Sequence, residues 1–194
     1  MHDSRPNILW YCTDQQRFDT IRAMGNQHIN TPNLDKFVSS GVAFRSAYTQ
    51  SPICTPSRAS FLTGRYPAST HVHRNGNSHF PGSEVLVTKL LADAGYDCGL
   101  IGKLHLATAA EGREKRTDDG YRAFHYSHHP MASAQQDCTQ YNDYTRWLAE
   151  EKGVNPVELY SKVSGFCTEG VPAELHQSTW CTDMAMRFIE ESRD

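Results

Sequence analysis

The chain has 194 residues, of which 38% are hydrophobic and 21% are charged, with a formal net charge of −3. This balance is typical of a globular protein with one ordinary core and argues against a disordered chain. The slightly acidic charge also argues against a general nucleic-acid or membrane-surface binder, which would carry a strongly basic surface.

The predicted elements alternate between strands and helices. The first strand is expected at residues 7–13, the apolar run NILWYCT. A helix should then begin at Thr31-Pro32-Asn33, with Asn33 as its cap, and end at Gly41. Further strands are expected at 42–48 and 96–101, and further helices at 56–62, 84–94, 139–152 and 177–191. Residues 65–82 are expected to be a loop, and 107–137 carry no assignable pattern.

This alternation predicts an α/β fold with a mostly parallel sheet sandwiched by helices. Ligands bind beyond the carboxyl ends of the strands in such sheets. Asp14 and the Lys103/His105 pair each follow a predicted strand directly, and Cys54 lies in the loop after another. The shared placement indicates that these residues belong to one site.

Six cysteines occur in the chain, and no two of them form a C-x-x-C pair. A zinc ribbon or a thioredoxin-type site is therefore not indicated. The opening residues MHDSRPNILW contain no apolar run of signal-peptide length, and no window approaches the ~20 apolar residues of a membrane span. We expect a cytoplasmic protein with mostly reduced thiols.

Cys54 stands where a Ser/Thr/Pro-rich loop meets a predicted helix, and Arg58 follows one turn later. The unpaired N–H groups and the dipole at a helix N-terminus favour an anion, so this position suits a thiolate or a bound oxyanion. Position alone fits equally well with an inert, buried cysteine beside a surface arginine.

Three other segments contain residues that could bind a ligand or a metal ion. Asp14-Gln15 offers hard oxygen ligands for a divalent cation, although two oxygens fall short of the ~6–8 that Ca²⁺ takes, and an ordinary turn explains the pair as well. Lys103 and His105 would point to the same side if the extended backbone persists, which would suit an oxyanion; an exposed strand end is the alternative. The loop 71–79, which contains Asn75, is expected to be solvated, and His128, His129 and His176 are expected at the surface or at helix ends.

Four motifs resemble those of type I sulfatases and occur in that family's order. Residues 54–64, CTPSRASFLTG, are similar to the signature C-x-P-S-R-x-x-x-L-T-G. Residues 31–44 resemble the segment T-P-N-L-D-x-L-x-x-x-G-x-x-F, 5–14 resemble the opening strand, and 102–105 are similar to G-K-x-H. These motifs span residues 5–105, whereas 106–194 match more loosely.

The resemblance implies an alkaline-phosphatase-like α/β fold and the hydrolysis of small-molecule sulfate esters. It also implies that a formylglycine-generating enzyme oxidises Cys54 to formylglycine, whose hydrate is the nucleophile. Arg58 would then hold this hydrate, while Lys103 and His105 would bind the sulfate or move the release proton. Asp14, Gln15 and the oxygen derived from Cys54 would ligate a divalent cation, by expectation Ca²⁺. Asn75 occupies a position where related enzymes contact the substrate.

The chain departs from the family pattern in two respects. Many members have two aspartates after the first strand, where this chain has Asp14-Gln15; that variant resembles the branch containing choline sulfatases and phosphonate monoester hydrolases. In addition, the family's later metal-binding pair, second lysine and downstream histidine have no match here. The resemblance therefore implies that 1–194 are the N-terminal part of a single catalytic domain, with half of the metal site and little or no turnover alone.

Three alternatives to a sulfatase remain open at this point. The first is a phosphonate monoester or phosphodiester hydrolase on the same scaffold. The second is a truncated, non-catalytic relative that acts as a binding module. The third is a plain cysteine hydrolase, which would leave the mass of Cys54 unchanged.

Overall fold

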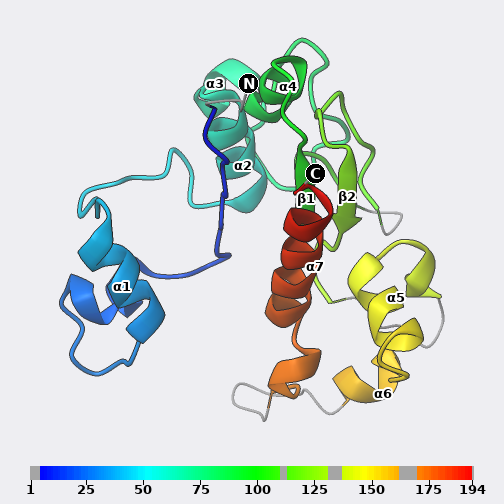
Figure 1. Ribbon diagram of the computed structural model, residues 1–194. Coiled ribbons are helices and arrows are strands. Elements are labelled where there is room, and N and C mark those ends of the chain that lie inside the picture. The colour runs from blue at the N-terminus through cyan, green and yellow to red at the C-terminus, as the bar shows by residue number, and fades with distance from the viewer. Residues whose placement is uncertain (1–4, 110–112, 131–136, 162–169, 194) are drawn as a thin grey trace. The chain divides into compact units, whose positions relative to one another are not determined.

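A computed structural model describes residues 5–109, 113–130, 137–161 and 170–193 (Figure 1). The chain divides into two compact units, Met1–Tyr48 and Thr49–Asp194. Among the described residues, no helix has the length and apolar character needed to cross a bilayer.

The first unit is built from two 3₁₀ turns and one helix. These elements are η1 (Phe18–Thr20), η2 (Arg22–Met24) and α1 (Pro32–Ser40). Thr31, directly before α1, donates from Oγ1 to Asp35 Oδ1 at 3.0 Å, and Asp35 Oδ1 also accepts from the Ala23 N–H at 2.9 Å. These bonds hold η2 against the start of α1. The predicted helix is therefore confirmed, but it begins at Pro32, so Asn33 lies inside its first turn rather than capping it.

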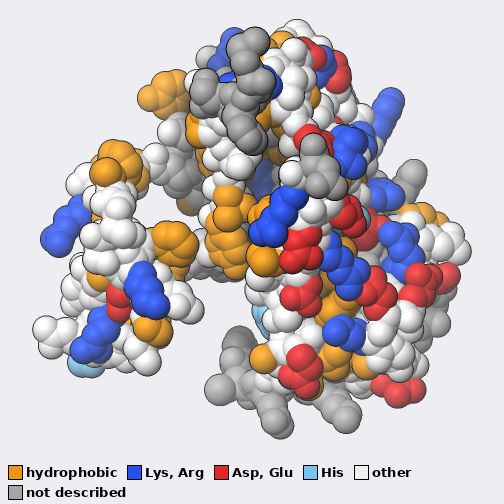
Figure 2. Space-filling view, viewed as in Figure 1, with side chains coloured by type: hydrophobic (Ala, Val, Ile, Leu, Met, Phe, Trp, Pro, Cys, Tyr) orange, Lys and Arg blue, Asp and Glu red, His pale blue; other side chains and the backbone are white. Residues whose placement is uncertain are grey.

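The strands predicted at 7–13 and 42–48 are not formed in the structure. Both segments are irregular, and Ile8, Leu9, Trp10 and Tyr11 expose 57–71% of their surface. Hydrophobic side chains stand at the surface of the first unit in the space-filling view (Figure 2). An apolar run becomes a strand only when its N–H and C=O groups pair with a neighbouring strand, and no such neighbour pairs with either segment among the described residues.

The second unit contains a parallel pair of strands, β1 (Gly99–Gly102) and β2 (Ala123–Tyr126), with Gly99 opposite Ala123 and Gly102 opposite Tyr126. The strand expected at 96–101 is thus confirmed, shifted toward its C-terminal end. β2 falls in the stretch 107–137, to which the sequence pattern assigned nothing. Because the strands are parallel, their carboxyl ends lie at the same edge of the pair.

Six α-helices accompany this pair in the described part of the second unit. They are α2 (Cys54–Thr63), α3 (Pro67–Thr70), α4 (Val87–Asp93), α5 (Asp143–Glu150), α6 (Pro156–Ser161) and α7 (Gln177–Glu191). Two 3₁₀ turns, η3 (Cys138–Gln140) and η4 (Ala173–Leu175), precede α5 and α7. The bounds of α7 agree with the prediction. In contrast, α3 lies in a stretch that was expected to be a loop; Pro67, at the first helical position, starts a short helix there.

Two apolar clusters form the core of the second unit. One joins α2 to the loops around α4 and to the ends of the strands; its fully buried members include Ala59, Leu86, Leu104 and Tyr126. The other lies between α5 and α7, which run beside the strands in Figure 1, and is formed by Tyr144, Trp147, Leu148, Trp180 and Met184. Acidic and basic side chains are interspersed on the visible surface over α7 (Figure 2). The two clusters fix the strand ends from both sides.

Asn142 caps α5 from a fully buried position. Its Oδ1 accepts from the Thr145 N–H at 3.0 Å, and its Nδ2 donates to the carbonyl of His129 at 2.8 Å. Replacing Asn142 by alanine removes the cap and leaves a carbonyl without its donor, so we expect a loss of about 2 kcal/mol in the free energy of unfolding, measured by urea denaturation.

Asn155 provides the matched control, because it is exposed and its Oδ1 accepts from the Val157 N–H at 3.0 Å at the start of α6. Asn155→Ala should cost clearly less, about 0.5 kcal/mol. Equal losses for the two variants would contradict the role assigned to Asn142.

Candidate active site

Cys54 is the first residue of α2, and its half-buried side chain touches the loop 71–79. Asn75 Nδ2 donates to Cys54 Sγ at 3.3 Å, and Asn75 Oδ1 accepts from the Thr55 N–H at 3.0 Å. One side chain therefore contacts both the thiol and a backbone donor at the helix N-terminus. The loop was expected to be solvated, and Asn75 is indeed exposed, but it is fixed to α2 by these two bonds.

Arg58 connects α2 to the end of β1. Its guanidinium Nη1 donates to the backbone carbonyl of Lys103, the first residue after β1. Arg58, one turn after Cys54 on α2, thus binds the backbone that directly follows β1. These contacts connect four predicted site residues in two pairs, Asn75 with Cys54 and Lys103 with Arg58, and α2 carries one member of each pair.

His105 has a backbone conformation that the sequence did not predict. Its φ is +57°, so the extended backbone of β1 does not persist to this residue, and the expected alternation of Lys103 and His105 along a strand is wrong. The His105 N–H donates to Glu114 Oε2 at 2.6 Å, and the Leu106 N–H donates to Glu114 Oε1 at 3.0 Å. His105 is 5% exposed, and its ring centroid lies 4.0 Å from that of His128.

A pocket of about 380 Å³ opens beside these residues. It is lined by Asn75, Gly76, His105, Thr108, Ala109, His128 and His129. Within the described part of the chain, the buried Nδ1 of His128 has no hydrogen-bond partner. A polar atom left without a partner at the edge of a pocket is a group that a ligand can satisfy.

Two residues of this site were missed by the sequence interpretation. His128 was expected at the surface, yet its ring packs on His105, and Glu114 lay in the unassigned stretch. His128 follows β2 as Lys103 follows β1, and the carboxyl ends of parallel strands meet at one edge. Recognising β2 would therefore have placed His128 in the site by the argument used for Lys103.

The site favours a neutral His128. Burial, together with the nearby charges of His105 and Lys103, lowers its pKa from 6.5 to about 3. Burial also lowers the pKa of His129, and burial raises the pKa of Glu114 against the opposing effect of its backbone donors. Lys103 and His105 therefore disfavour a protonated His128, and the carboxylate of Glu114 is engaged by the amides of His105 and Leu106.

The lowered pKa predicts acid sensitivity. Between pH 6.5 and about 3 the unfolded chain protonates His128 and the folded chain does not, so this contribution to stability is present above pH 6.5 and is lost as the pH falls. The raised pKa of Glu114 acts in the opposite direction. We expect the loss of unfolding free energy between pH 7 and pH 5, measured by urea denaturation, to be smaller in His128→Asn than in the wild type.

Exposed His73 lies in the same unit and provides the control for this comparison. His73→Asn should reproduce the pH dependence of the wild type. An unchanged loss in His128→Asn would contradict the assignment.

The predicted metal ligands fall in different units. Asp14 and Gln15 belong to the first unit, and Cys54 to the second. Within the described ranges, no group of three or more His, Cys, Asp or Glu side chains is arranged to hold a metal ion. A carboxylate and an amide supply the oxygen chemistry that Ca²⁺ prefers, but they do not complete its coordination shell. The set Asp14, Gln15 and Cys54 stays a prediction.

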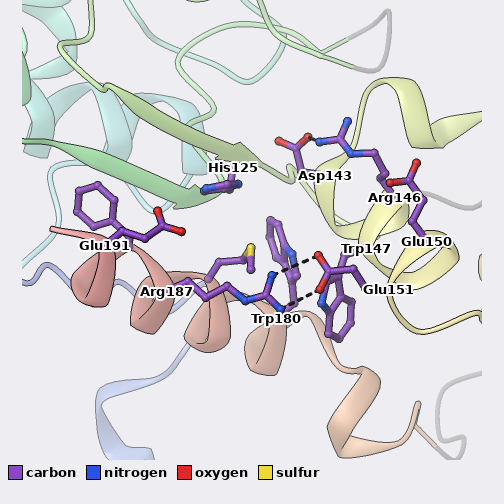
Figure 3. A pocket seen from close by; sticks show the side chains of 11 residues that line it. His125, Asp143, Arg146, Trp147, Glu150, Glu151, Trp180, Arg187 and Glu191 are labelled. Atoms are coloured by element: carbon purple, nitrogen blue, oxygen red, sulfur yellow. Dashed lines mark hydrogen bonds and ion pairs between the residues drawn. The ribbon is translucent and has the colours of Figure 1, made fainter.

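A second pocket, of about 250 Å³, lies between α5 and α7 and contains none of the predicted site residues (Figure 3). Two ion pairs lie in its lining: Arg187 Nη2 lies 2.8 Å from Glu151 Oε2, and Arg146 binds Asp143. This pocket is therefore lined by paired charges and by the apolar residues Trp147, Trp180 and Met184, and it is separate from the group around Cys54.

The parallel strand pair and its surrounding helices have an alkaline-phosphatase-like α/β fold. The solved phosphonate monoester hydrolase of Agrobacterium radiobacter matches 98% of this chain with a TM-score of 0.70, at 22% sequence identity and over 39% of its own length. The predicted fold class is thereby confirmed. The Sulfatase family model matches residues 6–179, and the chain belongs to the sulfatase family.

Curated relatives carry sulfatase names. Human steryl-sulfatase is 37% identical over 66% of this chain and 22% of its own length, and an arylsulfatase of Clostridium perfringens is 29% identical over 95% of this chain and 40% of its own length. An N-acetylglucosamine-6-O-sulfatase of Bacteroides thetaiotaomicron is 30% identical over 96% of this chain and 28% of its own length. The chain thus spans between about a fifth and two fifths of these relatives, which fits the predicted match to an N-terminal portion. That 1–194 form part of one catalytic domain stays a prediction.

Proposed function

We propose that the protein is a sulfuric ester hydrolase that uses a formylglycine hydrate at position 54 as its nucleophile. The observation that carries this proposal is the position of Cys54. It opens α2 within a C-x-P-S-R segment of a sulfatase-family chain. Asn75 connects that segment to the loop 71–79, and Arg58 connects it to the residue that follows β1.

The reaction would proceed in two covalent steps. One geminal hydroxyl oxygen of the hydrate attacks sulfur, the bond from sulfur to the ester oxygen breaks, and the alcohol leaves with a proton. The remaining hydroxyl then loses its proton, its oxygen forms the aldehyde carbonyl, and the bond from carbon to the sulfated oxygen breaks. Sulfate departs, and water restores the hydrate.

The residues around Cys54 have roles that match their positions. Asn75 Nδ2 already donates to the atom at the end of side chain 54, so it would donate to the hydrate. Arg58 holds the backbone at Lys103, whose ammonium group would bind a sulfate oxygen. His105 lines the pocket and would accept the proton released from the second hydroxyl.

The proposal includes a divalent cation, by preference Ca²⁺, and a modifying enzyme. The cation would be held by Asp14, Gln15 and the oxygen at position 54, and when bound it would polarise the sulfate oxygens. A formylglycine-generating enzyme would read Cys54, Pro56 and Arg58 in the C-x-P-x-R pattern. The oxygen chemistry of Asp14-Gln15 and the family match support this part of the proposal.

The mass of the peptide spanning Cys54 tests the proposal directly. In the complete gene product, coexpressed with a formylglycine-generating enzyme, conversion of the thiol to the aldehyde should lower that mass by ~18 Da. The converted protein should hydrolyse an aryl sulfate faster than the matching aryl phosphonate ester. An unmodified Cys54 in a protein that turns over ester would support the plain cysteine hydrolase instead.

Two other outcomes distinguish the remaining alternatives. Preference for the phosphonate ester would replace the sulfatase assignment with that of a phosphonate monoester hydrolase, the activity suggested by Asp14-Gln15. A converted protein without activity on either ester would support a non-catalytic relative.

A further inference from the structure

Glu114 is a buried carboxylate that the proposed reaction does not use. Its residue is 3% exposed, and both carboxylate oxygens accept hydrogen bonds. Oε2 accepts from the His105 N–H at 2.6 Å and from the Tyr126 hydroxyl at 3.4 Å, while Oε1 accepts from the Leu106 N–H at 3.0 Å. All three donors belong to the segments that follow β1 or end β2. Glu114 is therefore placed between the two strand ends that carry the site.

The backbone that Glu114 contacts is strained. His105 has φ +57°, a left-handed conformation that a residue with a side chain adopts only at a cost. This conformation turns the consecutive N–H groups of His105 and Leu106 toward one point, where an anion can accept from both. The carboxylate of Glu114 occupies that point. Its hydrogen bonds from the two amides compensate for the strain and select this conformation of His105.

The segment that carries Glu114 is itself fixed by its neighbours. Arg113 Nη2 donates to Asp143 Oδ2 at 3.2 Å, and the same Asp143 oxygen accepts from the Tyr126 N–H at 2.5 Å. Asp143 is the first residue of α5, so this contact connects Glu114's neighbour to a helix in the second apolar cluster. A carboxylate held in this way can determine the position of the residue that it binds.

We propose that Glu114 is a positioning residue for His105: by accepting from the amides of His105 and Leu106, it fixes the left-handed turn that presents the His105 imidazole to the pocket beside His128. This inference rests on the proposed function in so far as His105 handles the released proton. The geometric part, from Glu114 to the placement of the His105 ring, is independent of the reaction.

A double-mutant cycle in the complete, converted gene product tests the catalytic consequence. Glu114→Gln keeps the volume but offers one acceptor oxygen in place of two, so we expect kcat to fall by about 10- to 100-fold, the usual effect of a small misplacement at a reacting centre, with little change in KM. In a His105→Ala background the same substitution should cost less than about 2-fold, because the two residues act as one unit. An equal loss in both backgrounds, or no loss in the wild-type background, would overturn the proposal.

Asp119 provides the matched control for a general effect on folding. It is 1% exposed and its Oδ1 accepts from the Tyr121 N–H at 3.0 Å, so it too is a buried carboxylate that binds a backbone amide. It does not line the pocket. Asp119→Asn should leave kcat within about 2-fold of the wild type if it folds, because its bonds do not reach His105. A loss equal to that of Glu114→Gln would point to a general structural role for both residues.

A second readout uses the 194-residue chain and needs no turnover. The imidazole ¹H and ¹³C NMR signals of His105 and His128 report the 4.0 Å ring contact, and they should shift in Glu114→Gln but not in Asp119→Asn. Tyr126→Phe removes only the most distant of the three donors and should produce a smaller shift in the same signals, which keeps the test valid if Glu114→Gln does not fold. Unchanged ring signals would overturn the positioning role. Shifted signals in a protein that hydrolyses neither ester would retain that role and reject the proposed function.

Discussion

Cys54→Ala should abolish the hydrolysis of an aryl sulfate by the complete gene product. Under the proposed reaction the side chain at position 54 forms the covalent intermediate, and alanine lacks the thiol that is converted to the aldehyde. The loss should reach about 10³-fold or more, as expected when a covalent nucleophile is removed. Steady-state rates at saturating substrate, measured beside the mass of the peptide that contains residue 54, give the result.

Cys98→Ala is the matched control for this variant. Cys98 is also half-buried in the second unit, but its thiol donates to the Thr88 carbonyl at 3.7 Å and does not line the pocket of the candidate site. It should retain activity within a few-fold. If Cys54→Ala kept a tenth or more of the wild-type rate, position 54 would not supply the nucleophile.

Gly120→Ala is expected to destabilise the second unit more than any other change considered in this chain. Gly120 has φ +77°, and an added Cβ would lie 2.6 Å from the Thr88 carbonyl oxygen and 2.7 Å from Lys89 Cα. Both atoms belong to the backbone of α4, so the helix or the turn must move. Left-handed strain and overpacking together should cost about 3 kcal/mol or more in the free energy of unfolding, measured by urea denaturation.

Gly153→Ala separates the two contributions to this loss. Gly153 has φ +64°, but an added Cβ there would meet nothing within 4 Å. It should therefore cost only the strain, about 1 kcal/mol. A similar loss for both variants would show that the turn at Gly120 does not pack closely on α4.

The helices that the sequence predicted best begin and end at residues that favour helix ends, close to the helix in sequence. α7 begins where His176 Nδ1 accepts from the Ser178 N–H at 3.1 Å, and α2 ends at Gly64, which has φ +69°. Capping and helix-ending residues of this kind lie close to the helix in sequence, so a single sequence reveals them. The same holds for the spacing of Cys54 and Arg58 on one helix face.

The features that the sequence did not predict depend on contacts between distant segments. β2 is four residues long and becomes a strand through its pairing with β1, and Glu114 and His128 gain their places in the site from that pairing. Conversely, the run 7–13 has the composition of a buried strand but no strand partner among the described residues. A pattern in sequence indicates the tendency to form a strand, and only the neighbouring strands decide whether one forms.

In the candidate site, too, some features follow from local sequence and others from contacts between distant segments. The contacts that join Asn75 to Cys54 and Arg58 to Lys103 place predicted residues together. Their roles stay predictions, as does the metal-ligand set Asp14, Gln15 and Cys54. His105 was selected by its position after a strand, but its left-handed backbone follows from Glu114, which no local pattern could reveal.

The parallel pairing of Gly99–Gly102 with Ala123–Tyr126 has a consequence for the motions of the site. Lys103, His105 and Glu114 lie in the crossover that joins these strands, and His128 follows the second strand by two residues. Segments of this kind often open and close as a single cooperative unit, independently of global unfolding. Amide hydrogen exchange at His105, Leu106 and Ser127 should therefore share one opening free energy. Each such opening would displace the proposed sulfate-binding and proton-accepting groups together, while Cys54 and Arg58 stay on α2.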